Sequence, residues 1–258
     1  MSRIARVLAI AGSDSGGGAG IQADIKTITM LGGHAMTVIT AITAQNTLGV
    51  DAVQVLAPDM VIAQIDAVLR DIGVDAIKIG MIGSAGIANA VADRLDGIAV
   101  PIVLDPVMVA SSGASLADEA TIAALWRLMP RAQVVTPNLP ELAVLGGAEA
   151  LAAQRVTVLA KGGHGAGDVI VDVLSDGAAE VCRWSDTRID TRHSHGTGCT
   201  LASGIAAGLG QGMTLVDAIS RARRYVRAAL LAAPGLGAGH GPMGHALDRS
   251  WFASEEGA

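Results

Sequence analysis

The sequence predicts a doubly wound α/β fold, in which helices cover both faces of a mostly parallel sheet. Short, continuously apolar runs rich in Val and Ile recur along the chain, and segments with helical spacing lie between them. Continuous apolar character is typical of strands buried on both faces, and alternation of strands and helices is typical of a doubly wound sheet. Because no Pro- or Ser-rich linker interrupts the pattern, we expect residues 1–258 to form one domain.

The predicted strands are, in order, Val7 to Ala11, Met36 to Ile42, Ala76 to Ile79, Ile102 to Leu104, Val134 to Thr136, Val156 to Ala160 and Val169 to Val173. The predicted helices are Asp59 to Arg70, Ala85 to Leu95, Asp118 to Met129, Thr200 to Leu209 and Leu215 to Ala233. Polar and glycine-rich residues follow most of the strands. Since ligands of open α/β sheets bind beyond the carboxyl ends of the strands, we expect these loops to meet at one cleft.

Composition argues against several classes of protein. The chain is 51% hydrophobic, but its apolar runs are far shorter than the ~18 residues that a membrane-spanning helix needs. The apolar residues near the N-terminus end after Ala11, which favours a first buried strand over a leader peptide. A net charge of −6 makes nucleic acid a poor partner. Cys182 and Cys199 have no CxxC spacing, which excludes a disulfide scaffold or cysteine zinc site and favours a reducing cytoplasm.

The strongest candidate for chemistry is the turn Gly196-Thr197-Gly198-Cys199, directly before a helix of small residues. Two glycines let the backbone approach a ligand closely, and the N–H groups at a helix N-terminus suit a transferring phosphoryl group. The helix dipole is expected to lower the pKa of Cys199, which could then accept a proton. Alternatively, the segment is an ordinary tight turn, and Cys199 is a small buried side chain with no chemical role. His195, directly before the turn, could either orient phosphate or cap the loop.

Further polar residues are candidates for binding phosphate and metal. The glycine-rich segment from Asp14 to Gly20 fits neither the dinucleotide fingerprint nor the Walker A motif. Lys161 is then a candidate for binding phosphate, and Asp105 and Glu141 are candidate oxygen ligands of Mg²⁺. Taken singly, Asp105 before a proline could be a turn residue, and Glu141 could be a first-turn residue favoured by the helix dipole.

Together these motifs resemble the hydroxymethylpyrimidine/phosphomethylpyrimidine kinase family of thiamine biosynthesis, which has a ribokinase-like fold. The resemblance runs nearly end to end. It rests on the segments Ala9–Thr27, Ala44–Thr47, Lys78–Met81, Val103–Met108, Thr136–Glu141, Lys161–His164, His195–Thr200 and Gly237–His245, in that order.

The resemblance implies two phosphorylations by MgATP, first of 4-amino-5-hydroxymethyl-2-methylpyrimidine and then of its monophosphate. It implies that Gln45 binds the pyrimidine in a pocket lined by Gly12, Ala19, Met81 and Val107. A glutamine amide can pair with an amino group and its neighbouring ring nitrogen. Alternatively, Gln45 only satisfies loop backbone.

At the phosphate end, the resemblance implies that Lys161 and Thr197 bind ATP, that Asp105 and Glu141 serve the metal, and that Gly196 to Cys199 form the anion hole. Cys199 is then the suggested base, where wider ribokinase-like enzymes carry an Asp. A cytoplasmic homodimer is expected.

One departure from the family stands out between Leu145 and Val156, where we expect an unusually direct connection without the family's additional helix. Two other functions remain open. One is a pyridoxine/pyridoxal kinase of the same superfamily, and the other is a non-catalytic protein that binds a nucleotide or vitamin.

Overall fold

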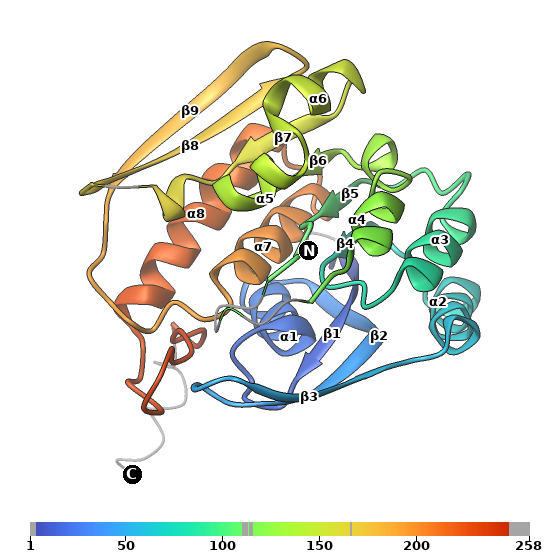
Figure 1. Cartoon of the computed structure of the whole chain (residues 1–258), viewed down its shortest axis with the longest axis horizontal. Coiled ribbons are helices and arrows are strands. Elements are labelled where there is room, and N and C mark those ends of the chain that lie inside the picture. The colour runs from blue at the N-terminus through green and yellow to red at the C-terminus, as the bar shows by residue number, and fades with distance from the viewer. Residues whose placement is uncertain (1–3, 110–112, 114–115, 166, 248–258) are drawn as a thin grey trace.

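The computed structural model describes residues 4–109, 113, 116–165 and 167–247, and within these ranges nine strands form one sheet (Figure 1). The sheet order is β3-β2-β1-β4-β5-β6-β7-β8-β9. Neighbours from β2 to β7 are parallel, whereas β3 at one edge and β8 and β9 at the other pair antiparallel. The strands are β1 (Arg6–Asp14), β2 (His34–Gln45), β3 (Val50–Val55), β4 (Ala76–Ile79), β5 (Ile102–Leu104), β6 (Val134–Val135), β7 (Thr157–Ala160), β8 (Val169–Asp176) and β9 (Ala179–Thr187).

Helices cover both faces of the sheet, as the sequence predicted. One apolar core packs α2 (Pro58–Asp71), α3 (Ala85–Arg94), α4 (Glu119–Leu125) and α6 (Gly147–Ala153) against one face. The other core packs α1 (Gly20–Met30), α7 (Thr197–Gly210) and α8 (Leu215–Leu231) against the opposite face. The remaining helices are α5 (Leu139–Val144) and the short 3₁₀ turns η1 (Met129–Arg131) and η2 (Gly162–His164).

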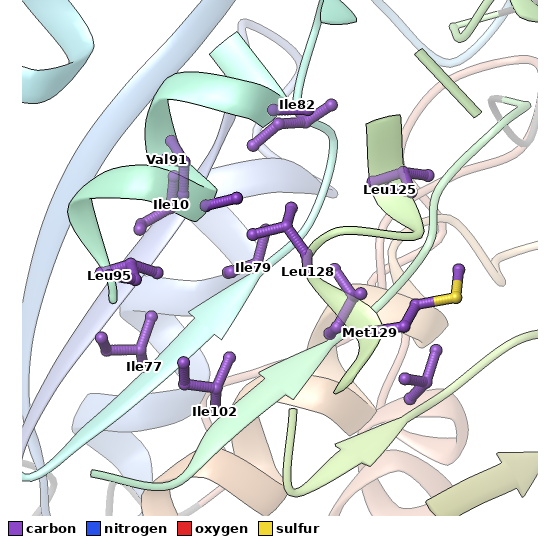
Figure 2. Packing of buried hydrophobic residues seen from close by; sticks show 14 of the residues in the cluster. Ile10, Ile77, Ile79, Ile82, Val91, Leu95, Ile102, Leu125, Leu128 and Met129 are labelled. Atoms are coloured by element: carbon purple, nitrogen blue, oxygen red, sulfur yellow. The ribbon is translucent and has the colours of Figure 1, made fainter. Parts of the chain in front are cut away.

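The first core explains why the parallel strands are continuously apolar in the sequence. In Figure 2, Ile77 and Ile79 of β4 belong to the same buried cluster as Val91 and Leu95 at α3. All four residues of β4 are buried, because helices cover it on both sides. Among the described residues, no helix is both long enough and apolar enough to cross a membrane.

The structure adds two edge strands that the sequence patterns did not predict. In β3 the central residues are exposed, and in β9 exposed positions dominate, so neither shows the apolar run of a buried strand. Both are held by antiparallel pairing to a neighbour, β2 or β8. Edge strands of this kind are held by backbone hydrogen bonds to the neighbouring strand more than by burial of their side chains.

The prediction of a direct connection between Leu145 and Val156 is wrong. Helix α6 occupies Gly147–Ala153, and its Leu151 is fully buried in the first core. Together with α5, it forms the helical crossover that a parallel β6–β7 pair requires. The small residues and paired glycines of this segment concealed the helix, because only one large apolar side chain marks its buried face.

A buried ion pair links three of these elements. The Nζ of Lys78 on β4 donates to both carboxylate oxygens of Asp24 on α1, each at 2.9 Å. Ser203 on α7 donates to the same carboxylate at 2.6 Å. Both charged side chains are fully buried. Burial lowers the pKa of Lys78, but Asp24 and further anionic neighbours raise it more, so the ammonium stays charged.

We predict that Lys78→Met lowers the free energy of unfolding by about 3–5 kcal/mol, because Asp24 would be left buried without its partner. The double variant Lys78→Met/Asp24→Leu should recover most of this loss, since no buried charge then remains. Urea unfolding followed by circular dichroism measures both. A double variant that is as unstable as the two single variants combined would contradict this account.

Candidate active site

A cleft of about 830 Å³ lies beyond the carboxyl ends of the parallel strands. This is where open α/β sheets bind ligands, and the volume suits small molecules. The structure brings together here every site residue predicted from the sequence, namely Gly12, Ala19, Gln45, Met81, Asp105, Val107, Glu141, Lys161, Gly196, Thr197, Gly198 and Cys199.

The glycine turn begins α7 at Thr197, three residues earlier than predicted. Gly196 caps the helix with a φ of 86°, and a Cβ there would lie 1.9 Å from the carbonyl oxygen of Gly18. Only glycine therefore lets this turn pack against the glycine-rich segment after β1. The Thr197 N–H donates to Ser194 O at 3.3 Å. The N–H groups of Gly198 and Cys199 belong to the first helical turn, which has no intrahelical acceptors and suits an anion.

Lys161 and Asp105 meet directly opposite this turn. Lys161 Nζ donates to Asp105 Oδ1 at 2.7 Å, and the hydroxyl of Thr136 donates to the same oxygen at 2.9 Å. A Cβ on Gly198 would lie 3.2 Å from Asp105 Oδ2 and 3.3 Å from Lys161 Nζ. Burial lowers the pKa of Lys161, but Asp105 and then Glu141 raise it by more, so this lysine is a cation beside the glycine turn.

Glu141 completes the acidic side of the cleft. It forms a capping box at the start of α5, where its Oε2 accepts the N–H of Asn138 and its own N–H donates to the Asn138 side chain. Burial raises the pKa of Glu141 to about 7; Lys161 opposes this rise, and Asp105 adds to it.

Asp105 and Glu141 therefore form a pair of nearby carboxylates whose mutual repulsion a cation would relieve, and their oxygens suit Mg²⁺. The described ranges contain no group of three or more His, Cys, Asp or Glu side chains placed to hold a metal ion. A Mg²⁺ held here would need other ligands, such as phosphate oxygens and water.

The expected low pKa of Cys199 is wrong for the ligand-free protein. Burial raises the pKa of this thiol to about 11. Lys78 and the Gly20 N–H favour the thiolate, whereas Asp24 and Asp105 oppose it. The dipole argument considered the start of α7 alone and could not include the loss of water or the two carboxylates, which lie far away in the sequence.

The other end of the cleft is formed around Gln45 at the end of β2. The pairing between β2 and β3 shifts at this point, since Ala44 pairs with Ala52 and Gln45 with Val50. Irregularities of this kind re-aim side chains next to functional sites. Met81 contributes an apolar wall, where its Sδ would lie 3.0 Å from a Cβ on Gly12.

Sequence reasoning missed two polar residues at this end, Asp14 and Thr43, which also line the cleft. In the sequence, Asp14 was noted only as the first residue of the glycine-rich segment and was given no role of its own. Its carboxylate accepts N–H groups of Gly16, Gly18 and Ala19 at 2.8–3.0 Å. Thr43 could have been found from strand periodicity, because it lies two residues before Gln45 and shares its face.

Known proteins share both the sequence and the architecture. A family model described as phosphomethylpyrimidine kinase matches residues 14–244. The chain is 48% identical to the hydroxymethylpyrimidine/phosphomethylpyrimidine kinase of Rhizobium meliloti, over 95% of this chain and 97% of that one. It is 49% identical to a thiamine biosynthesis bifunctional protein of Geobacter sulfurreducens, over 93% of this chain but 52% of that longer protein.

Among solved structures, the ADP complex of Bacillus subtilis pyridoxal kinase superposes with a TM-score of 0.86. The two sequences are 32% identical, and the match covers 95% of this chain and 98% of that one. The fold is therefore that of the ribokinase-like vitamin kinases.

We predict that Glu141 makes the ligand-free protein less stable as pH rises. Its pKa of about 7 in the folded protein lies above the ordinary 4.5, so its contribution is complete below about pH 4.5 and is lost as pH rises through 7. The loss is on the order of 3 kcal/mol.

Glu141→Gln provides the control, because it keeps an oxygen for the Asn138 N–H but cannot ionise. Its unfolding free energy, measured in urea at pH 5 and pH 8 without nucleotide or metal, should decline less than that of the wild type. Parallel declines in the two proteins would show that Glu141 does not titrate as described.

Proposed function

The chain belongs to the phosphomethylpyrimidine kinase family, and we propose that the cleft described above carries out both of its phosphoryl transfers. The protein is a hydroxymethylpyrimidine/phosphomethylpyrimidine kinase of thiamine biosynthesis, an ATP-dependent phosphotransferase. The observation that carries the assignment to this cleft is that the candidate site residues, although scattered along the sequence, all line it. Mass spectrometry of purified protein incubated with MgATP and the pyrimidine tests the transfer directly.

At the substrate end, Gln45 pairs with the amino group and the adjacent ring nitrogen of the aminopyrimidine. Its amide offers one donor and one acceptor side by side, as this edge requires. Gly12, Ala19, Met81 and Val107 form the walls around the ring. The hydroxymethyl group then points to the start of α7, which lines the same cleft.

At the phosphate end, Lys161 and Thr197 hold the ATP phosphates, and Gly196 to Cys199 receive the charge of the transferring group. Asp105 and Glu141 would hold Mg²⁺, which would supply charge neutralisation and orientation of the phosphates. Lys161 can exchange its hydrogen bond to Asp105 for one to the ATP phosphates, since its ammonium and the Asp105 carboxylate both lie next to Gly198. Positioning and electrostatics supply most of the rate enhancement in such reactions.

The remaining task is removal of the hydroxyl proton, which we assign to Cys199. The thiol lies beside the anion hole but is protonated in the ligand-free protein at neutral pH. Of the groups that oppose its ionisation, Asp105 is also a proposed metal ligand. If the charge of Asp105 were neutralised, the thiol would ionise more readily, while burial remains the largest cause of its raised pKa.

The cysteines and the family resemblance also bear on the cellular compartment and the oligomeric state. Among the described residues both cysteines are free thiols, which fits a reducing cytoplasm where ATP is abundant. We further propose that the active form is a homodimer, as the family resemblance suggests; sedimentation of the purified protein tests it.

We predict that Cys199→Ala lowers kcat by about 10²–10⁴-fold, because a positioned proton acceptor contributes about that much. The KM for ATP should change little, since the backbone N–H groups remain. Cys199→Ser is the matched control for shape, and steady-state kinetics with purified protein distinguishes the two parameters. Unchanged turnover in Cys199→Ala would remove the thiol from the chemistry.

We predict a higher kcat/KM for the hydroxymethylpyrimidine than for pyridoxine, with Gln45→Leu erasing most of the difference. A site that pairs with both polar groups of one substrate should reject an analogue that leaves them unpaired, by on the order of 100-fold or more. Competition between the two substrates in a single assay gives the ratio. A wild-type preference for pyridoxine, or an unchanged ratio in Gln45→Leu, would overturn this role of Gln45.

A further inference from the structure

The amide of Gln45 sits within a buried polar network that no predicted role explains. Its Oε1 lies 3.0 Å from the hydroxyl of Thr43, and its Nε2 lies 3.3 Å from His195 Nε2. His195 Nε2 in turn lies 2.9 Å from Asp14 Oδ2. Thr43, His195 and Asp14 are all buried, with 7% exposure or less. Few protons are available in such a network, so their positions can be deduced.

The first deduction concerns His195. Asp14 is a carboxylate, because it already accepts three backbone N–H groups. Burial raises its pKa, but the bonds from His195 and the backbone lower it further, below the usual range. A carboxylate can only accept, so His195 Nε2 must carry the proton that points to Asp14. The Gln45 NH₂ group therefore cannot donate to that nitrogen.

The second deduction concerns Thr43. Its hydroxyl lies 3.0 Å from the carbonyl oxygen of Ser13 and 3.0 Å from Gln45 Oε1. Both neighbours are acceptors, yet a hydroxyl has one proton. Because the Ser13 carbonyl can only accept, both contacts are hydrogen bonds only if the hydroxyl donates to Ser13 and accepts from a donor on Gln45.

One change resolves both conflicts. If the Gln45 amide is turned by 180°, its Nε2 donates to Thr43, and its Oε1 becomes a second, more distant acceptor for the single Nε2 proton of His195, which points mainly to Asp14. Amide orientation is assigned from the hydrogen-bond network in this way, since oxygen and nitrogen have nearly the same shape. In the turned amide no donor faces a donor and no acceptor faces an acceptor, whereas the opposite orientation sets the NH₂ group against the His195 N–H.

We propose that Thr43 and the Asp14–His195 pair are positioning residues that hold the Gln45 amide in this one orientation for reading the substrate. The amide then keeps one N–H and one oxygen lone pair for a ligand. An aminopyrimidine edge, with an amino donor beside a ring-nitrogen acceptor, takes up this pair of groups. The inference rests on the proposed recognition of the pyrimidine by Gln45 and adds what determines its orientation.

This arrangement has a specific energetic consequence. An amide that is free to turn by 180° would present donor and acceptor to the substrate in either order, and one of these orders places like groups opposite each other. Fixing the amide in advance removes the wrong order and the cost of selecting the right one. Removing Thr43 or His195 should therefore weaken pyrimidine binding only through Gln45.

Thr43 offers a matched pair of variants for the test. Thr43→Val removes the oxygen at nearly constant shape, and Thr43→Ser keeps it. Calorimetric titration with 4-amino-5-hydroxymethyl-2-methylpyrimidine measures the Kd of each, in both the wild-type and the Gln45→Leu background. We expect Thr43→Val to weaken binding about tenfold, as for one lost hydrogen bond. Thr43→Ser should stay within about threefold.

In the Gln45→Leu background, Thr43→Val should have no further effect, because the amide that it orients is gone. His195→Leu, with His195→Gln as the variant that keeps a donor, forms a second cycle and decides the matter if Thr43→Val does not fold. Equal losses in both backgrounds would overturn this inference while leaving the proposed function intact. A wild-type protein that does not bind the pyrimidine would overturn both.

Discussion

The ion pair between Lys78 and Asp24 determines where elements that line the cleft meet. It joins β4 to α1, and Ser203 adds α7 through the same carboxylate. Ser203 lies one helical turn after Cys199, so the contact that holds it also sets the position of the glycine turn Gly196–Cys199. A buried ion pair is weak evidence for net stability, because desolvation of both charges is costly. Its value here lies in geometry: three elements distant in sequence must converge for both charges to be satisfied.

Two other buried carboxylates extend the same principle to the ends of the cleft. Asp14 accepts the N–H groups of the glycine-rich segment and also bonds to His195, directly before the turn Gly196–Cys199. Asp105 accepts from Lys161 and Thr136, which come from two further loops. Loop geometry and binding chemistry thus depend on the same atoms. A substitution that removes either charge changes the shape of the cleft as well as its electrostatics.

The sequence was sufficient for the central strands and for the turn Gly196–Cys199, because buried parallel strands and glycine turns leave strong local patterns. It was insufficient where the cause is not local. Strand β3 is held by its ladder with β2, and its exposed side chains carry no apolar signal. Helix α6 buries little more than Leu151. The raised pKa of Cys199 comes from burial and from carboxylates on other elements.

Substrate choice depends on features still finer than these. The chain shares its architecture with a pyridoxal kinase at a TM-score of 0.86, so the fold alone cannot distinguish a pyridoxal substrate from a hydroxymethylpyrimidine. The difference must come from polar groups in the cleft, and here they lie at irregular points of the sheet. Strand pairing shifts around Gly12 between β1 and β2, and again at Gln45 between β2 and β3. A regular strand would only alternate its side chains between faces, whereas these shifts can re-aim one amide without changing the surrounding fold.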